Sequence, residues 1–376
     1  MKDKQELKIK KEKLKCVSAF MCCFLIFNFS FLIGYSQDMH FSQFTQAPLQ
    51  VNPAQAGTTA WIRGIIIYRN QWSNVVPYNS FGFSFDQKIK KRWKQISPKT
   101  RTLLFKSVTE KGLGWGVGVY NDRAGDGHMN TLQGNLSVAY QVQISKESML
   151  SGGLQAGIVQ RSITYSGLTW ENQYSPGSAT GFDPSANPVE NFSNSSIIYP
   201  DLSCGLFYAY RKNERYMRGN DQRDIVLGAS VMHLNRPAYS FFGNNERLSL
   251  RYMLHGSGII GISNTNFALV PGVMYAKQTP NTEFLFGTLV RYMLKEDSKY
   301  TGYVKGAAFS LGGYYRYKDA AVIAAVMEFS AYQIGLSYDI NVSDFKAASQ
   351  GMGGFEITLR FLNPAPFLFT KASFNN

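Results

Sequence analysis

Apolar and polar side chains alternate with a period of two along most of this chain after residue 36. The clearest run covers residues 332–341, which read Tyr-Gln-Ile-Gly-Leu-Ser-Tyr-Asp-Ile-Asn. Such alternation predicts β-strands with one apolar face, and a polar or glycine-rich face opposite it is typical of a transmembrane barrel wall. No run of about 20 apolar residues follows residue 36, which excludes helical spans there. A closed barrel remains, because closure gives every backbone N–H and C=O a partner in lipid.

The alternating pattern recurs in an even number of segments, as expected for a bacterial barrel. The first segment, with three consecutive isoleucines at 65–67, and the twelfth, at Ala320–Ala325, fit the pattern least well. We therefore predict an all-β, antiparallel transmembrane β-barrel of about 14 strands, within a range of about 12–16. The segments are 60–69, 79–89, 112–121, 131–144, 148–164, 197–211, 223–234, 246–262, 265–277, 282–294, 302–317, 320–328, 331–341 and 353–362.

The gaps between these segments predict which end of the barrel faces the periplasm. If the first strand starts on the periplasmic side, connections after odd-numbered strands face outward, including the longest gap, at 166–196, which is rich in Asn, Ser, Gly and Pro. Gaps after even-numbered strands are short around Lys146, around Asn264 and between the twelfth and thirteenth segments. The exception, Lys90–Lys111, is either a partner-binding element or a sign that the strand count is off by one there.

Residues 1–36 have the pattern of a secretory signal peptide. Seven lysines within the first 15 residues precede an apolar run from Cys16 to about Gly34, and small and polar residues around Ser36 offer a cleavage site. The alternative is a membrane anchor, because the run is near the lower length limit for a transmembrane helix. Cleavage would leave Cys204 as the one cysteine, so the mature chain could form neither an internal disulfide nor a multi-cysteine metal site.

The expected organisation is a signal peptide at 1–36, an N-terminal periplasmic segment that leads into the barrel at 37–59, the outer-membrane β-barrel at 60–362 and a C-terminal tail at 363–376. Removing the leader takes away seven lysines and three acids, which leaves 32 basic and 22 acidic residues. In an exported chain this charge does not indicate nucleic-acid binding. Its densest block, Lys88–Lys94, is either a solvated loop or a surface for acidic partners or anionic headgroups.

Several residues stand out as structural or partner-contact candidates. Turn chemistry at Asn52-Pro53, with Gly57 after it, predicts that the N-terminal segment folds into or beneath the barrel; alternatively, it gates the lumen or contacts a periplasmic subunit. His233 is expected to hydrogen-bond a turn at the end of a strand and fix the loop that follows. The remaining candidates lie at strand ends or on the last strands: Arg69, Gln71, Trp72, Asn235, Pro237, Tyr338 and Asp339.

Inward-facing charges are also expected along the strands. Trp61 and Trp72 suit an interfacial aromatic belt. A charge network across the lumen, primarily structural and secondarily ion-selective, would be formed by Arg63, Arg69, Asp86, Glu356 and Arg360.

The motifs of catalysis and cofactor binding are missing from the sequence. The glycines of Gly112–Gly118 fall at every second position, unlike a phosphate-binding loop, and no helix is expected after them. No two of the four histidines have metal-ligand spacing, and no Ser/His/Asp or Cys/His set can be assembled. We therefore expect neither enzymatic activity, nor a cofactor, nor a metal.

Several blocks spread along the chain can be compared with known families by their order and spacing. The blocks are Gln37–Gly57, Tyr68–Trp72, Pro200–Tyr208, Leu227–Pro237, Pro271–Gln278, Tyr315–Ala320, Ile334–Asp339 and Glu356–Leu359. Together they resemble the PorP/SprF family of outer-membrane proteins, which belongs to the type IX secretion and gliding machinery of Bacteroidetes-type bacteria.

The resemblance implies an integral outer-membrane protein that acts with periplasmic type IX subunits. It also implies export and anchoring of a large surface protein, typically a gliding adhesin with a type-B C-terminal domain. The long Lys-rich leader and the basic 90–111 stretch depart from the typical pattern and leave the subgroup open.

Three functions compete at this point. The first is the type IX partner protein, embedded in outer-membrane lipid. The second is a porin or transporter for small solutes, because inward polar residues serve a pore as well as a filled lumen. The third, a barrel enzyme such as a lipase, is disfavoured because no nucleophile motif occurs.

Overall fold

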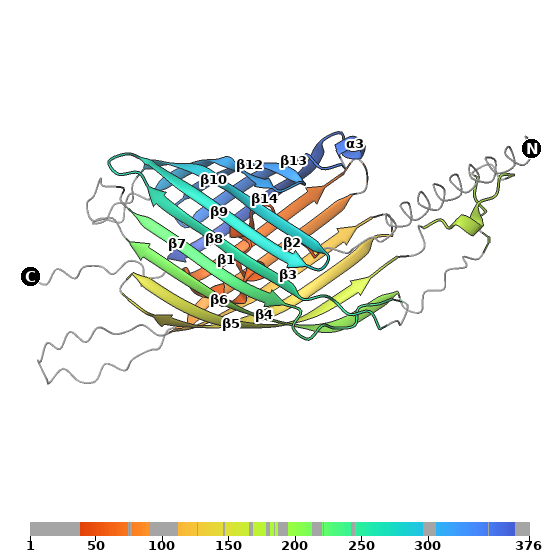
Figure 1. The fold of residues 1–376 in the computed structure, drawn as a ribbon, viewed down its shortest axis with the longest axis horizontal. Coiled ribbons are helices and arrows are strands. Elements are labelled where there is room, and N and C mark those ends of the chain that lie inside the picture. Colours follow the sequence, from red (N-terminus) through yellow and green to blue (C-terminus); the bar gives the residue numbers. More distant parts are fainter. Residues whose placement is uncertain are drawn as a thin grey trace, which may run out of the picture. The chain divides into compact units, whose positions relative to one another are not determined.

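The chain folds into a closed barrel of fourteen antiparallel strands, each paired with its neighbours in sequence, and β1 pairs with β14 to close the sheet (Figure 1). The predicted barrel and its strand number are confirmed. The strands are β1 (Ala60–Gln71), β2 (Tyr78–Ile89), β3 (Gly112–Ala124), β4 (Met129–Gln143), β5 (Ser148–Ser162), β6 (Ser196–Lys212), β7 (Arg223–Met232), β8 (Arg251–Gly261), β9 (Phe267–Gln278), β10 (Asn281–Lys295), β11 (Ala307–Arg316), β12 (Ala320–Phe329), β13 (Tyr332–Asn341) and β14 (Met352–Pro364).

The computed structural model describes most of the chain between residues 38 and 364. The signal-peptide segment and the tail after residue 364 lie outside the described residues, as does the 90–111 stretch, so these predictions remain untested. The gaps in the description are 74, 76, 90–111, 126, 146, 165–167, 178–180, 184, 187–194, 213–219, 221, 242–244, 296–305 and 345.

Two strands begin five residues later than predicted: β8 begins at Arg251 and not at residue 246, and β11 begins at Ala307 and not at residue 302. The residues before β8 form an isolated bridge between Ala238 and Arg247, so the chain folds back on itself before it joins the wall. Both weakly patterned segments are strands: β1 contains the three isoleucines and β12 contains Ala320–Ala325.

The two ends of the barrel are named by their turns. The even end carries the connections that follow even-numbered strands, such as 144–147 and 330–331, and the odd end carries those that follow odd-numbered strands, such as 279–280 and 317–319. The three short even-end gaps are observed as predicted, but several odd-end turns are equally short. Loop length therefore does not distinguish the two ends, although the longest connection, 163–195, is at the odd end.

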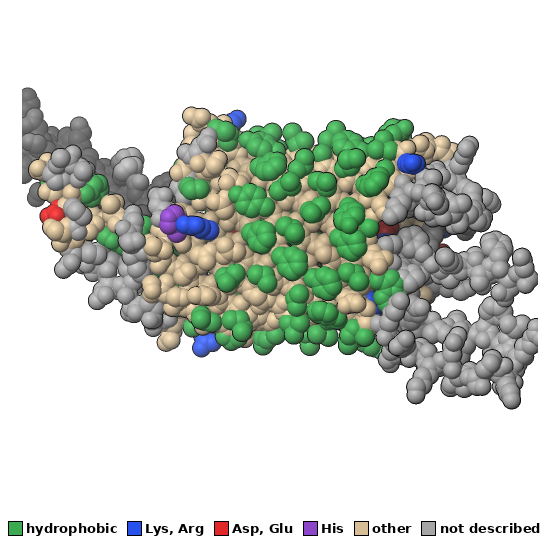
Figure 2. All heavy atoms as spheres, turned by 180° about the vertical axis from the view of Figure 1, so that it is seen from behind, with side chains coloured by type: hydrophobic (Ala, Val, Ile, Leu, Met, Phe, Trp, Pro, Cys, Tyr) green, Lys and Arg blue, Asp and Glu red, His purple; other side chains and the backbone are tan. Residues whose placement is uncertain are grey.

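Large apolar side chains cover the outer wall. Figure 2 shows them spread over the drawn face of the barrel, with charged side chains toward its two ends. Leu154, Ile158, Ile198 and Leu206 are each more than 60% exposed, which is costly in water and favourable against lipid tails. Within the described residues, no helix is long and apolar enough to cross a membrane.

The described part of the chain also contains five short helices. Three of them precede β1: η1 (Phe44–Gln46), α2 (Pro48–Val51) and η2 (Pro53–Gln55). The other two, η3 (Glu171–Gln173) and α3 (Lys346–Ser349), lie in odd-end connections.

Candidate functional site: an occupied lumen

Residues 39–59, here called the plug, lie inside the barrel. Ser42, Asn52 and Ala54 have no exposed surface, although they belong to no strand. The plug crosses the lumen lengthwise, because His40 accepts a hydrogen bond from Arg69 near the odd end and Gly57 accepts one from Gln141 near the even end. A position inside the barrel is one of the two placements, into or beneath the barrel, that the turn chemistry of this segment predicted.

A cluster of buried charges holds the odd-end part of the plug. Asp339 on β13 accepts hydrogen bonds from Arg69 at 2.7 Å, from Arg316 at 3.0 Å and from the Ser42 hydroxyl at 2.7 Å. Glu356 on β14 accepts the backbone N–H groups of Ser42 and Gln43 at 2.8 and 3.0 Å. Strands and plug thus neutralise each other's polar groups in a place that water does not reach.

Asn52 fixes the middle of the plug. Its side-chain oxygen caps η2 by accepting the Ala54 N–H at 2.9 Å. Its amide nitrogen donates to the carbonyls of Leu206 on β6 and Ala229 on β7, at 2.8 and 3.3 Å, and lies 3.2 Å from His255 Nε2. One side chain therefore joins the plug to two adjacent strands.

Glycines in the wall make this close approach possible. A Cβ atom at Gly205 would lie 2.1 Å from the Asn52 side-chain oxygen, and one at Gly228 would lie 2.2 Å from His255 Nε2. Two serines of the wall also hold the plug here. Ser151 donates a hydrogen bond to Ala54 O at 2.8 Å, and Ser230 donates one to Val51 O at 2.6 Å.

A second ion pair anchors the even-end part of the plug. Arg63 on β1 and Asp86 on β2 form two hydrogen bonds, at 2.7 and 3.1 Å, and both residues are about 1% exposed. The same carboxylate accepts the Gly57 N–H at 2.7 Å, and Gly57 has a φ of +63°, which glycine adopts without strain. Arg63 also donates to Gln55 O at 3.0 Å.

Part of the lumen wall is apolar, which corrects the prediction of a polar or glycine-rich inner face. Phe44 of the plug lies edge-on to Tyr314 with ring centroids 6.3 Å apart. Their cluster includes Met274 and Val322, whose side chains face inward. On the opposite side, Phe41 and Ala47 pack against Ile67 and Tyr120. These inward apolar residues are explained by the apolar side chains that the plug brings to them.

The structure brings some of the candidate residues together and separates others. Arg69 and Asp339 meet at the odd end of the lumen, and Asn52, Pro53 and Gly57 are buried farther along it. Tyr338 faces outward and is 42% exposed. The expected lumen charges Arg63, Asp86 and Glu356 are likewise buried there, and Arg360 donates to Gln46 at 3.3 Å.

The odd-end rim holds two further candidates. Gln71 is buried at the end of β1. Trp72 follows it with a φ of +49°, and its ring lies 6.1 Å from that of Tyr78.

His233 and Asn235 act at a different place. Nδ1 of His233 lies 2.9 Å from the Asp201 carboxylate, and the Asn235 amide donates to Pro200 O at 2.7 Å while its oxygen accepts the Leu202 N–H at 3.2 Å. They tie the β7–β8 connection, which also contains Pro237, to β6. Within the described residues, no group of three His, Cys, Asp or Glu side chains could hold a metal ion.

The plug leaves a cavity of about 360 Å³ near the even end. Arg63, Arg360 and Gln55 line it together with the apolar side chains of Val270 and Leu289. Its wall includes the pair formed by Arg211 and Asp224.

Replacing Asn52 with alanine should loosen the plug without removing the barrel. The variant loses a helix cap and two buried hydrogen bonds, which together cost roughly 2–4 kcal/mol. We expect limited proteolysis to cut within residues 39–59 faster than in the wild-type protein, and Gln50→Ala, at a partly exposed plug position, serves as the control. Equal cutting rates in the two variants would contradict the anchoring role of Asn52.

The sequence matches the family described as "Type IX secretion system membrane protein PorP/SprF" over residues 33–361. Solved barrels also match, among them the Ralstonia pickettii toluene transporter TbuX, at 9% identity with a TM-score of 0.43, covering 85% of this chain and 93% of that one. The CymD monoaromatic hydrocarbon channel matches at 10% identity with a TM-score of 0.42, covering 89% and 95%. Similarities at this level do not indicate what this barrel binds or transports. No curated protein sequence matches the chain.

Proposed function

Because the chain belongs to the PorP/SprF family of type IX secretion system membrane proteins, we propose that this integral outer-membrane barrel is a docking component of that system. In this role it supports the export and surface anchoring of a large partner protein, such as an adhesin with a type-B C-terminal domain. It also contacts periplasmic subunits of the machinery. Nothing in this role requires catalysis.

The plug is the observation that carries this proposal. A barrel that conducts solutes needs an aqueous path, whereas this lumen holds some twenty residues fixed at both ends and in the middle by buried hydrogen bonds. Such a lumen is suited to a rigid membrane anchor whose rims and loops bind other proteins. It is poorly suited to the alternative role of a porin for small solutes.

Rigidity is the property that a docking component requires. The plug replaces lumen water by internal hydrogen bonds and apolar contacts, so the barrel resists deformation when a partner pulls on one end. The odd-end connections 163–195 and 233–250 are among the longest in the chain, and we propose that they face outward and contact the exported partner.

Deletion of the gene in the source bacterium tests the proposal. We expect one or more large surface proteins to remain inside the cell or to be degraded, while uptake of small solutes changes little. A mild-detergent pull-down with a tag near Ser178, read by mass spectrometry, should recover the same surface protein together with periplasmic type IX subunits. Normal display of every large surface protein in the deletion strain would contradict the proposal.

A further inference from the structure

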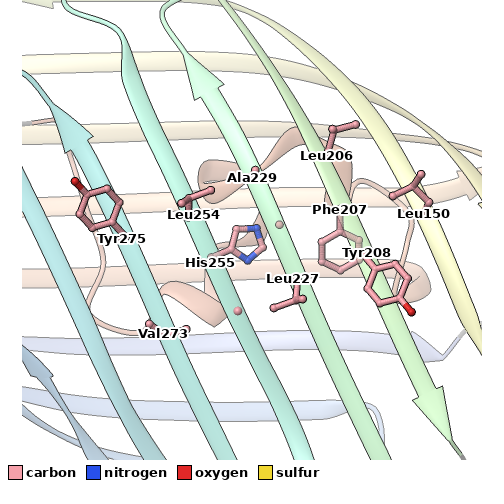
Figure 3. A pocket seen from close by; sticks show the side chains of 12 residues that line it. Leu150, Leu206, Phe207, Tyr208, Leu227, Ala229, Leu254, His255, Val273 and Tyr275 are labelled. Atoms are coloured by element: carbon pink, nitrogen blue, oxygen red, sulfur yellow. The ribbon is translucent and has the colours of Figure 1, made fainter.

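The outer wall of the barrel has an apolar hollow over β6–β9. Its volume is about 470 Å³, and it is open toward the membrane side. Figure 3 shows Leu206, Leu227, Leu254 and Val273 around it, with the His255 and Phe207 rings at the level of the strands. We call this hollow the β6–β9 groove.

Strand register explains why the groove exists. On the outward face, Ala229 is paired with Leu206 and Leu254, and Gly256 is paired with Leu227 and Val273. Two small residues at diagonal positions therefore sit between large aliphatic ones. A Cβ at Gly256 would lie 3.0 Å from Leu227 Cδ2, so even one methyl group would enter the groove.

The chemistry of the groove suits an apolar occupant, because its lining is apolar and it opens in the lipid-facing wall of a membrane barrel. Water in such a hollow would lack hydrogen-bond partners. The hydrocarbon chain of a lipid would recover the dispersion contacts that an empty hollow loses.

Two cations lie on the same outward face toward the even end. Lys212 and Arg223 are paired in register on β6 and β7, and by alternation they face outward, because their neighbours Arg211 and Asp224 line the internal cavity. Like charges directly opposite each other destabilise a sheet. Among the residues that the structure describes, Glu147, which accepts a hydrogen bond from the Tyr210 hydroxyl at 3.1 Å, is a nearby acid, and its single charge offsets one of the two cations.

The spacing between the cations and the groove fits a lipid. Arg223 is four residues from Leu227 along β7, which corresponds to about 13 Å. A phosphate held between Lys212 and Arg223 would accept several charge-assisted hydrogen bonds. Its acyl chain would reach the level of Gly256, which is paired with Leu227, after roughly ten carbons. Ala229 is six residues from Arg223, about 20 Å along the strand, and lies farther along the same chain.

We infer that the β6–β9 groove binds one acyl chain of an anionic glycerophospholipid whose phosphate lies between Lys212 and Arg223. This site is independent of the proposed secretion role, because it lies on the lipid-facing wall and uses no plug residue. The groove determines that a chain binds, and the cation pair determines the preference for an anionic headgroup.

Filling the groove tests the chain site. Gly256→Leu should lower the fraction of delipidated protein that retains phosphatidylglycerol in native mass spectrometry, by about tenfold in affinity. The matched control is Gly134→Leu, an outward position on β4 with open space around it. Retention in Gly256→Leu equal to that in Gly134→Leu would overturn the inference.

Removing the cations tests the headgroup site. The wild-type protein should prefer phosphatidylglycerol to phosphatidylcholine, and K212Q/R223Q should reduce this preference to near equality. K277Q, which removes an outward cation at the odd end of β9, should leave it unchanged. Selective binding of lipid A with no phospholipid preference would overturn the assignment, as would loss of preference in K277Q alone.

A labelling experiment on the wild-type protein does not depend on the folding of any variant. A phosphatidylglycerol with a photoactivatable group near the tenth chain carbon should label peptides that contain Leu227, Leu254 or Val273. Labelling spread evenly around the barrel would show ordinary lipid contact and overturn the inference.

Discussion

Deleting residues 39–57 is expected to convert the barrel into an open channel. The plug occupies the lumen from the odd end to the even end, and its Ser42, Asn52 and Gly57 contacts hold it in place. Without it, a fourteen-stranded wall encloses space of the kind that larger porins leave to water. Single-channel conductance in planar bilayers should rise by roughly an order of magnitude or more over that of the intact protein.

The control for this deletion is a cut of similar length outside the lumen. Removing residues 171–186 from the β5–β6 connection shortens the chain without touching a plug contact, and it should leave conductance at the level of the intact protein. If the plug deletion conducts as little as the intact protein, another part of the chain must close the lumen. High conductance in the intact protein would favour the porin alternative.

The wall of this barrel could be predicted from the sequence because lipid imposes a simple rule on it. Every outward residue of β13, from Tyr332 to Ile340, contacts the same apolar medium, so alternation is regular. The rule weakens where the lumen has its own partners. Ile65 and Ile67 face inward and are 2% exposed, and this obscured the pattern of β1.

β12 shows the same effect. Its inward Val322 and Ala324 belong to the apolar cluster around Phe44, so apolar residues lie on both faces of the strand. The poor alternation of this segment was a sign of a filled lumen, and the sequence alone offered no way to say what filled it.

The plug contacts could be predicted only in part. Turn chemistry at Asn52-Pro53 and Gly57 indicated a folded segment, and inward charges on the strands were expected. The partners of these residues could not be predicted, because each partner is distant in the sequence. Asn52 is 154 residues from Leu206, and Ser42 is 297 residues from Asp339. Gly205, Gly228 and His255 matter because they lie against Asn52 in the folded barrel, and the periodicity of the sequence does not show that contact.

Asp339→Asn is expected to be the most destabilising single change in the lumen. It removes the carboxylate that Arg69 pairs with at 2.7 Å, whereas Arg316 keeps Asp319 at 2.8 Å and Glu283 at 3.4 Å. Breaking a buried ion pair by removing one partner costs about 3–5 kcal/mol. Folding into lipid vesicles from urea, followed by the gel-mobility difference between folded and unfolded barrels, measures the loss. Asp183→Asn, at a partly exposed residue in the β5–β6 connection, is the control and should change stability by less than about 0.5 kcal/mol.

A double variant separates the charge effect from simple loss of a hydrogen bond. Arg316→Gln/Asp339→Asn removes one charge of each sign and so keeps the net charge of the cluster at its wild-type value, so the double variant should be less destabilised than the sum of the two single changes, by about 1–3 kcal/mol. Additive effects would show that Asp339 acts as an ordinary acceptor for Ser42 and not as the counterion of the cluster.

Because the cluster holds the plug and touches no external surface, export should persist in any Asp339 or Arg360 variant that still inserts. Loss of export with normal insertion would instead assign these inward charges a direct part in secretion.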